Sequence, residues 1–187
     1  MMILYKGYRI FAFSDTHGLH EKVAVPSGTD ILICAGDVES DSCCLASFLS
    51  WYAAIPAQLH LFTPGNHDLS FDLDEVLARR CIPCNVILLQ NGRLVFEELV
   101  FHSADARPWL FGFADIPDDV DILITHGAPC DCLDNGKGCR YLADVILRHR
   151  PKIHLFGHIH ECGNKSLMAS GIAFHNVSLY QELVKDL

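Results

Sequence analysis

Short apolar runs recur along the chain, and most of them end beside a carboxylate, imidazole or amide side chain. The runs are rich in β-branched residues, which is typical of buried strands in a parallel sheet. They lie at residues 8–14, 30–34, 58–63, 85–89, 121–125 and 152–156. Residues 93–101 and 172–177 alternate apolar with polar side chains, which predicts strands with one solvent-exposed face.

Helical spacing separates some of these runs. Apolar residues at i, i+3, i+4 and i+7 predict helices around residues 45–52 and 142–149. Residues 72–80 predict a shorter helix, with Asp72 as the N-cap and Glu75 three residues later. Strands that alternate with helices predict an α/β fold with a largely parallel sheet, and the later strands predict a second sheet. Because no repeat, low-complexity tract or linker divides the sequence, we expect residues 1–187 to form a single domain.

Five polar clusters follow the predicted strands. They are Asp15-Thr16-His17, Gly36-Asp37, Gly65-Asn66-His67-Asp68, Thr125-His126-Gly127 and Gly157-His158-Ile159-His160. Ligands of open α/β sheets bind beyond the carboxyl ends of the strands, so we expect these clusters to meet. One cluster alone could be a turn or a helix cap, but five in equivalent positions indicate a two-metal centre. Carboxylate, amide and imidazole ligands together favour manganese, iron or zinc over calcium.

The overall composition narrows the function. A net charge of −9, with histidine neutral, argues against a surface for long nucleic acid. Half of the residues are hydrophobic, yet no apolar stretch approaches the roughly 18 residues that a membrane span needs. Lys6, Gly7 and Arg9 interrupt the apolar start of the chain, so we interpret it as a strand and not as a signal peptide. We therefore expect a cytoplasmic protein that does not bind membranes.

The nine cysteines are an odd number without a regular framework, which predicts reduced thiols. Cys81 and Cys84 have the spacing of a zinc or redox pair, but no second pair matches them. Packing is therefore the expected role of the cysteines.

In this order, the five clusters resemble the motif set of the calcineurin-like metallophosphoesterases. The resemblance covers roughly residues 8–178, and residues 125–129 and 155–161 are most similar to the small cap-less branch called metallophosphoesterase-domain-containing proteins. It implies a two-sheet β-sandwich flanked by helices, with four layers in the order αββα.

The resemblance also implies a role for each side chain. One metal ion would be held by Asp15, His17 and His160, the second by Asn66, His126 and His158, and both by the bridging Asp37. His67 would not bind metal and would face the substrate, oriented by Asp68. In that position it would stabilise charge on the phosphoryl oxygens or protonate the leaving alkoxide.

The implied activity is hydrolysis of small phosphomonoesters or phosphodiesters, which include cyclic nucleotides. The attacking group would be a hydroxide that bridges two divalent or mixed-valence metal ions. Two divalent ions, two aspartates and one hydroxide leave roughly one positive charge, which attracts phosphate despite the acidic chain. A nuclease is an alternative, but the sequence shows neither a basic groove nor a DNA-binding domain. A non-catalytic metal-binding scaffold for protein partners is a second alternative. The substrate, the metals and the oligomeric state stay open.

Residues 101–109 depart from the branch pattern, in which a Gly-Ser-Pro-like turn and a longer aromatic stretch are usual. We therefore expect a pocket wall of different shape. Trp109 or Phe111 could stack on a substrate ring, although core packing is the more common fate of an aromatic side chain. Surface charge is the expected role of four basic residues, Arg107, Lys137, Arg140 and Lys165.

Overall fold

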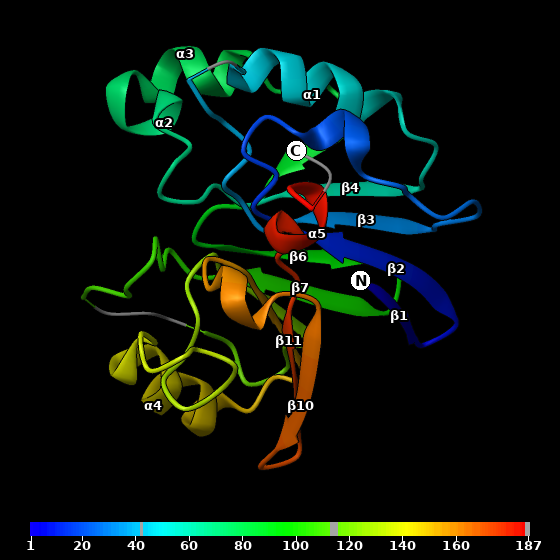
Figure 1. Ribbon diagram of the computed structural model, residues 1–187. Helices are drawn as coiled ribbons and strands as arrows, with labels where there is room; N and C mark the ends of the chain where they lie inside the picture. Colours follow the sequence, from blue (N-terminus) through cyan, green and yellow to red (C-terminus); the bar gives the residue numbers. More distant parts are fainter. Residues whose placement is uncertain (42, 113–115, 186–187) are drawn as a thin grey trace.

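Two β-sheets face each other in the computed structural model, which describes residues 1–41, 43–112 and 116–185 (Figure 1). The first sheet has the order β1-β2-β3-β4-β5, with bounds Met2–Tyr5, Tyr8–Phe13, Ile31–Cys34, Leu59–Phe62 and Val86–Leu88. β1 and β2 are antiparallel, and the other neighbours are parallel. The second sheet has the order β10-β11-β9-β8-β7-β6. The bounds of these strands are β6 Gly92–Phe96, β7 Leu99–Ser103, β8 Ile122–Ile124, β9 Ile153–Phe156, β10 Lys165–Ala169 and β11 Ile172–Asn176.

Helices cover the outer face of each sheet (Figure 1). The first sheet carries α1 (Leu45–Ala54), α2 (Ser70–Leu73) and α3 (Glu75–Arg80), and the second carries α4 (Arg140–His149). The short elements are η1 (His20–Lys22), η2 (His160–Cys162) and α5 (Tyr180–Leu183). The expected order of layers, αββα, is therefore confirmed.

The strand sequences explain why both faces of each sheet are covered. Side chains alternate between the faces of a strand, so an apolar run buries residues on both sides. In β2, Phe13 packs towards Phe48 of α1, whereas Ile10 enters the cluster between the two sheets. In β8, Ile124 joins the same central cluster and Leu123 packs with the cluster beneath α4.

Three expected elements differ from the structure. Residues 93–101 form part of a hairpin, β6 and β7, because the chain turns at Glu97, which has a left-handed φ of 52°. The apolar start of the chain is also a hairpin, which turns at Lys6 and Gly7 with φ values of 46° and 83°. The helix expected at 72–80 is divided into α2 and α3 at Asp74, and Asp74, not Asp72, is the N-cap that accepts a hydrogen bond from the Leu77 amide.

The parallel strands of the two sheets end at one shared edge. Backbone bonds join the loops there: the Asp15 amide donates to Gly36 at 2.9 Å, and the Gly157 amide donates to His126 at 2.9 Å. The sheets are linked directly where the Ser14 amide donates to the Val177 carbonyl at 3.1 Å. All five polar clusters lie on the loops of this edge, as expected.

The nine cysteines are free thiols. Among the described residues, no helix is long and apolar enough to cross a membrane.

Candidate metal centre

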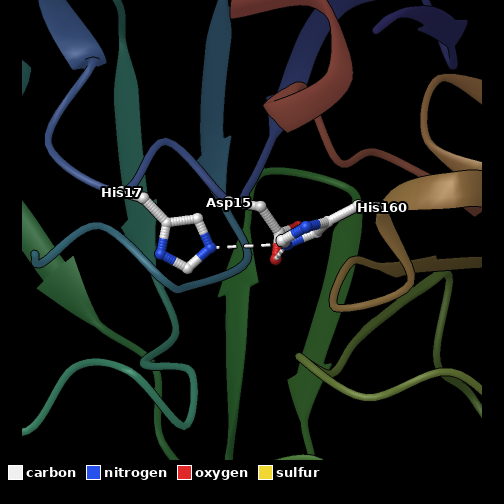
Figure 2. A group of neighbouring side chains, drawn as sticks. All are labelled: Asp15, His17 and His160. Atoms are coloured by element: carbon white, nitrogen blue, oxygen red, sulfur yellow. Dashed lines mark hydrogen bonds and ion pairs between the residues drawn. The ribbon is translucent and has the colours of Figure 1, made fainter. Parts of the chain in front are cut away.

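Asp15, His17 and His160 form the first group of converging side chains (Figure 2). Asp15 and His17 follow β2, and His160 comes from the loop after β9 in the other sheet. Their ligand atoms all lie within 4.8 Å of one another. The Nε2 atoms of the two histidines are 3.4 Å apart, and the Nε2 atom of His160 is 3.2 Å from the Asp15 carboxylate. This spacing fits three ligands around one ion.

Asp37, His126 and His158 form the second group, with the same 4.8 Å limit between ligand atoms. Asp37 follows β3, His126 follows β8 and His158 follows β9, so this group also draws on both sheets. Among the described residues, these are the two groups of three or more His, Cys, Asp or Glu side chains that could hold a metal, and Cys81 and Cys84 belong to neither.

Asp37 lies between the two groups. Its Oδ2 atom is 3.1 Å from Nε2 of His126 and 3.9 Å from Nε2 of His17. Its other oxygen accepts a hydrogen bond from the His67 amide at 2.7 Å, which fixes the carboxylate in this position. The predicted bridging position of Asp37 is therefore compatible with the geometry.

Among the described residues, the buried Oδ1 atom of Asn66 has no hydrogen-bond partner, and the buried Oδ2 atom of Asp37 and Nε2 atom of His126 have only each other, at 3.1 Å. A buried polar atom without a partner costs free energy, so each such atom needs an explanation. All three belong to residues predicted to bind metal. A cation would satisfy each of them, and the donor set therefore fits a metal ion.

The backbone is strained at four of the predicted ligands. Asp15, His17, Asp37 and His158 have φ values of 56°, 42°, 57° and 64°. This left-handed region costs a non-glycine residue of order 1 kcal/mol, and such strain concentrates at functional sites. These four residues lie on the loops after β2, β3 and β9, and each belongs to one of the two groups.

Glycine is required beside the ligands because the loops are crowded. A Cβ atom on Gly65 would collide with Oδ1 of Asp37, and one on Gly157 would collide with Oδ2 of Asp15. Both glycines were expected to allow sharp turns, but at these two positions close approach to a carboxylate is the physical reason.

His126 is completely buried and held in one tautomer. Its Nδ1–H donates to the Ala35 carbonyl at 2.8 Å, which leaves Nε2 as the atom that faces Asp37. Burial lowers the pKa of this imidazole, but the charge and hydrogen bond of Asp37 outweigh burial and raise it to about 9. In His158, burial and the charge of the neighbouring His126 together lower the pKa to about 4. Without metal, His126 therefore carries a proton that an ion must displace.

His67 and Asp68 occupy different environments. The His67 side chain is exposed, and its ring lies edge-on to His17 with centroids 5.1 Å apart. Asp68 is fully buried, and its carboxylate accepts hydrogen bonds from four backbone amides, those of Gly65, Asp37, Val38 and Glu39.

These contacts differ from the expected pairing of Asp68 with the His67 imidazole. Both oxygens of Asp68 are directed at the backbone, so this residue holds together the loops after β3 and β4. Burial, together with the charge of Asp37, raises the pKa of Asp68 to about 6. The amide hydrogen bonds oppose that rise.

A small cavity opens beside the first group. It has a volume of about 310 Å³ and is lined by His17, His67, Leu69 and the polar residues Glu39, Ser40 and Asp41. Glu39 is fixed by the amide and hydroxyl of Ser70, at 2.9 and 2.7 Å. The cavity gives a small molecule access to the candidate centre, and its carboxylates discourage a polyanion.

Within the segment that departs from the branch pattern, residues 101–104 and Ala106 are buried, whereas Asp105 and Trp109 are exposed. Trp109 and Phe111 are 51% and 80% exposed, so the expectation that they pack in the core is wrong. Arg107 pairs with Asp105 and Asp72, at 3.0 and 3.2 Å, which joins this segment to α2. Lys137 pairs with Glu161, while Lys165 lines a second cavity of about 470 Å³ that includes His160.

Two residues near the centre were not expected from the sequence. The ring of Tyr180, at the start of α5, lies 4.3 Å from that of His160 and 5.2 Å from that of His17. Asn176 is fully buried and donates to the carbonyl of Ile159, the residue between the two histidines of the last cluster. Neither residue belongs to a ligand-rich cluster, and the family resemblance carries no motif for them.

A family model described as calcineurin-like phosphoesterase matches residues 8–162. The chain belongs to this family. The family expected from the motifs is confirmed, and the structure of this member contains two candidate sites for divalent metal.

Relatives of this calcineurin-like phosphoesterase include human metallophosphoesterase domain-containing protein 1. The two are 29% identical over 215 residues, which cover 88% of this chain and 64% of the relative. The Caenorhabditis elegans protein called UPF0046 protein K07C11.7 is 31% identical over 186 residues, which cover 82% of this chain and 63% of that protein. The chain thus spans a little under two thirds of these relatives.

Solved structures share the fold. Phosphopantetheinyl hydrolase (PptH) from Mycobacterium tuberculosis superposes with a TM-score of 0.68 at 16% identity, covering 95% of this chain and 92% of its own. TT1561 of Thermus thermophilus superposes with a TM-score of 0.61 at 16% identity, and the match covers 90% of this chain and 89% of the TT1561 chain. At such identities the similarity establishes the architecture alone.

Proposed function

We propose that this chain is a dinuclear metal-dependent phosphoesterase that hydrolyses small phosphomonoesters or phosphodiesters. The observation that carries the proposal is the meeting of two groups of metal-binding side chains, in which the buried Oδ2 atom of Asp37 and Nε2 atom of His126 have only each other as partners among the described residues. Two transition-metal ions bound there would make hydroxide available at neutral pH and withdraw charge from the phosphoryl oxygens. Manganese, iron and zinc suit the mixed oxygen and nitrogen ligands.

The residues of the chain would divide between direct ligands and the groups that orient them. Asp15, His17 and His160 would hold one ion, Asn66, His126 and His158 the other, and Asp37 would bridge them. The carbonyl of Ala35 supports this arrangement because it fixes the tautomer of His126, and hydrogen-bond partners of this kind orient metal ligands.

We propose that His67 acts on the substrate. Its exposed ring stands beside His17 and lines the same cavity, so it could reach a phosphoryl oxygen or the leaving group. Because Asp68 is occupied by backbone amides, we propose that Asp68 acts indirectly, by shaping the loop that carries Asn66 and His67.

Small substrates fit the site better than nucleic acid. The described residues that line the cavity of about 310 Å³ include no lysine or arginine, and they include Glu39 and Asp41. A nucleic acid would bring many phosphates to that acidic rim without counter-charges. As part of the proposal, the chain works as one domain in the cytoplasm.

The test is hydrolysis by the purified protein with added manganese. The panel contains an aryl phosphomonoester, an aryl phosphodiester, cyclic nucleotides and a phosphopantetheinyl ester, the last suggested by the name of the structural neighbour. Asp37→Asn should abolish activity, and Asp41→Asn, which removes an exposed carboxylate from the same rim, should retain it.

A chelator should remove activity and added metal should restore it. If the protein binds two ions but hydrolyses nothing on the panel, the scaffold alternative is favoured and the proposed hydrolysis is wrong.

A further inference from the structure

The C-terminal segment lies against the first group of metal-binding side chains. Residues 176–180 run from the last residue of β11 to the first residue of α5, and they lie beyond the part of the chain that the family model matches, which ends at residue 162. The last turn of the chain, α5, lies near the edge where the two sheets meet (Figure 1).

Hydrogen bonds fix this segment on both sides of the site. The Leu179 amide donates to the Ser14 carbonyl at 3.1 Å, directly before Asp15. The Asn176 side chain donates to the Ile159 carbonyl at 3.0 Å, directly before His160, and accepts from the Ser178 amide at 3.1 Å. The start of α5 is therefore tied to the two loops that supply the first group.

Tyr180 projects from this anchored segment onto both histidines. Its half-buried ring is tilted by 30° from the plane of the His160 ring, with 4.3 Å between the centroids. It meets His17 edge-on, with 5.2 Å between centroids and 86° between planes. The two imidazoles are in turn 5.3 Å apart at 71°. The three rings form one packed group.

We propose that Tyr180 is a positioning residue for the first metal site, and that its ring holds His17 and His160 with their Nε2 atoms directed at one ion. An imidazole is free to rotate about two side-chain bonds, so a ligand pair needs packing or hydrogen bonds to stay aimed at a metal. His160 is 28% exposed, and Tyr180 covers one face of its ring. The effect acts on ligand geometry and does not require the tyrosine to contact the substrate.

This inference rests on the proposed function, because it assumes that the first group binds an ion. The test compares Tyr180→Phe with Tyr180→Ala, and Tyr141→Ala, on the remote helix α4, serves as the tyrosine control. Manganese binding is followed by metal content after dialysis and by electron paramagnetic resonance, in which two coupled Mn²⁺ ions differ from one.

Tyr180→Ala should raise the dissociation constant of one of the two ions by about ten-fold or more, as the loss of groups that orient metal ligands does elsewhere. At limiting manganese it should show the signal of a single ion. Tyr180→Phe and Tyr141→Ala should bind both ions like the wild type. Tyr180→Leu, which keeps an apolar cover but lacks a planar ring, replaces the alanine variant if that variant does not fold, and it should also weaken one ion.

Unchanged binding of both ions to Tyr180→Ala would overturn the inference and leave the proposed function intact. Equal losses in Tyr180→Phe and Tyr180→Ala would also overturn it, because the hydroxyl and not the ring would then be responsible. A wild-type protein that binds fewer than two ions would instead refute the proposed function, and the positioning role with it.

Discussion

The proton on His126 makes metal binding strongly dependent on pH. In the metal-free protein, Asp37 raises the pKa of this buried imidazole to about 9, so it is protonated at pH 7. An ion that binds Nε2 must displace this proton. At pH 7, about two pH units below that pKa, the displacement costs on the order of 3 kcal/mol at roughly 1.4 kcal/mol per unit. Apparent affinity for the second ion should therefore rise close to ten-fold between pH 7 and pH 8, and should level off above pH 9.

Two measurements test this reasoning. Isothermal titration calorimetry in buffers of different ionisation enthalpy counts the protons released on binding, and the count should include one from His126 at pH 7. His158, with a pKa of about 4, is already neutral and should contribute none. Nuclear magnetic resonance of the imidazoles in the metal-free protein provides the direct control. If the ring of His126 titrates at or below the ordinary 6.5, the ion pair with Asp37 does not control metal binding and the reasoning is refuted.

Four substitutions, with Gly92→Ala as a control for the last, extend the account. His67→Ala should lower turnover by about 10²- to 10⁴-fold with both ions retained, as expected for loss of an acid catalyst, measured by kinetics beside metal analysis. Asp37→Ala should lose metal, measured in the same way. His154 is fully buried, and burial lowers its pKa to about 3. Folding therefore favours the neutral imidazole, and the free energy of unfolding falls as the pH drops below 6.5, the pKa of this side chain in the unfolded chain. Between pH 7 and pH 5 the wild type should lose about 2 kcal/mol more stability than His154→Gln in urea unfolding. Gly65→Ala should cost about 1–3 kcal/mol in the same assay, because its Cβ would meet Asp37, whereas Gly92→Ala, with no atom closer than 3.8 Å, should cost less.

Each of these has a contrary outcome. An empty centre in His67→Ala would make this histidine a ligand, and a full centre in Asp37→Ala would remove the bridge from the account. Parallel pH profiles for wild type and His154→Gln would show that this imidazole titrates normally. Equal stability of the two glycine variants would contradict the crowding around Asp37.

The positions of the ligand clusters are predictable from the sequence because they depend on local pattern. An apolar run followed by Asp15, Asp37 or His126 places a polar side chain at the end of a strand, and parallel strands end at one edge. The role of Asp68 is not predictable in this way. Its four amide partners belong to two loops that only the fold brings together.

Packing across long sequence distances accounts for the other omissions. Tyr180 meets His17 through the pairing of residues near Ser14 with the C-terminal segment, and no spacing in the sequence encodes that contact. The β6–β7 hairpin resembles one strand in the sequence because its turn uses Glu97 and Glu98 where glycine or asparagine is usual. Strand β10 is mostly exposed and carries little apolar pattern.

The most direct test of the two-metal account is anomalous X-ray diffraction from crystals grown with manganese. The account predicts two ions in each chain, one bound by Asp15, His17 and His160 and the other by Asn66, His126 and His158, with Asp37 contacting both. A single ion, or two ions that do not share Asp37, would contradict it.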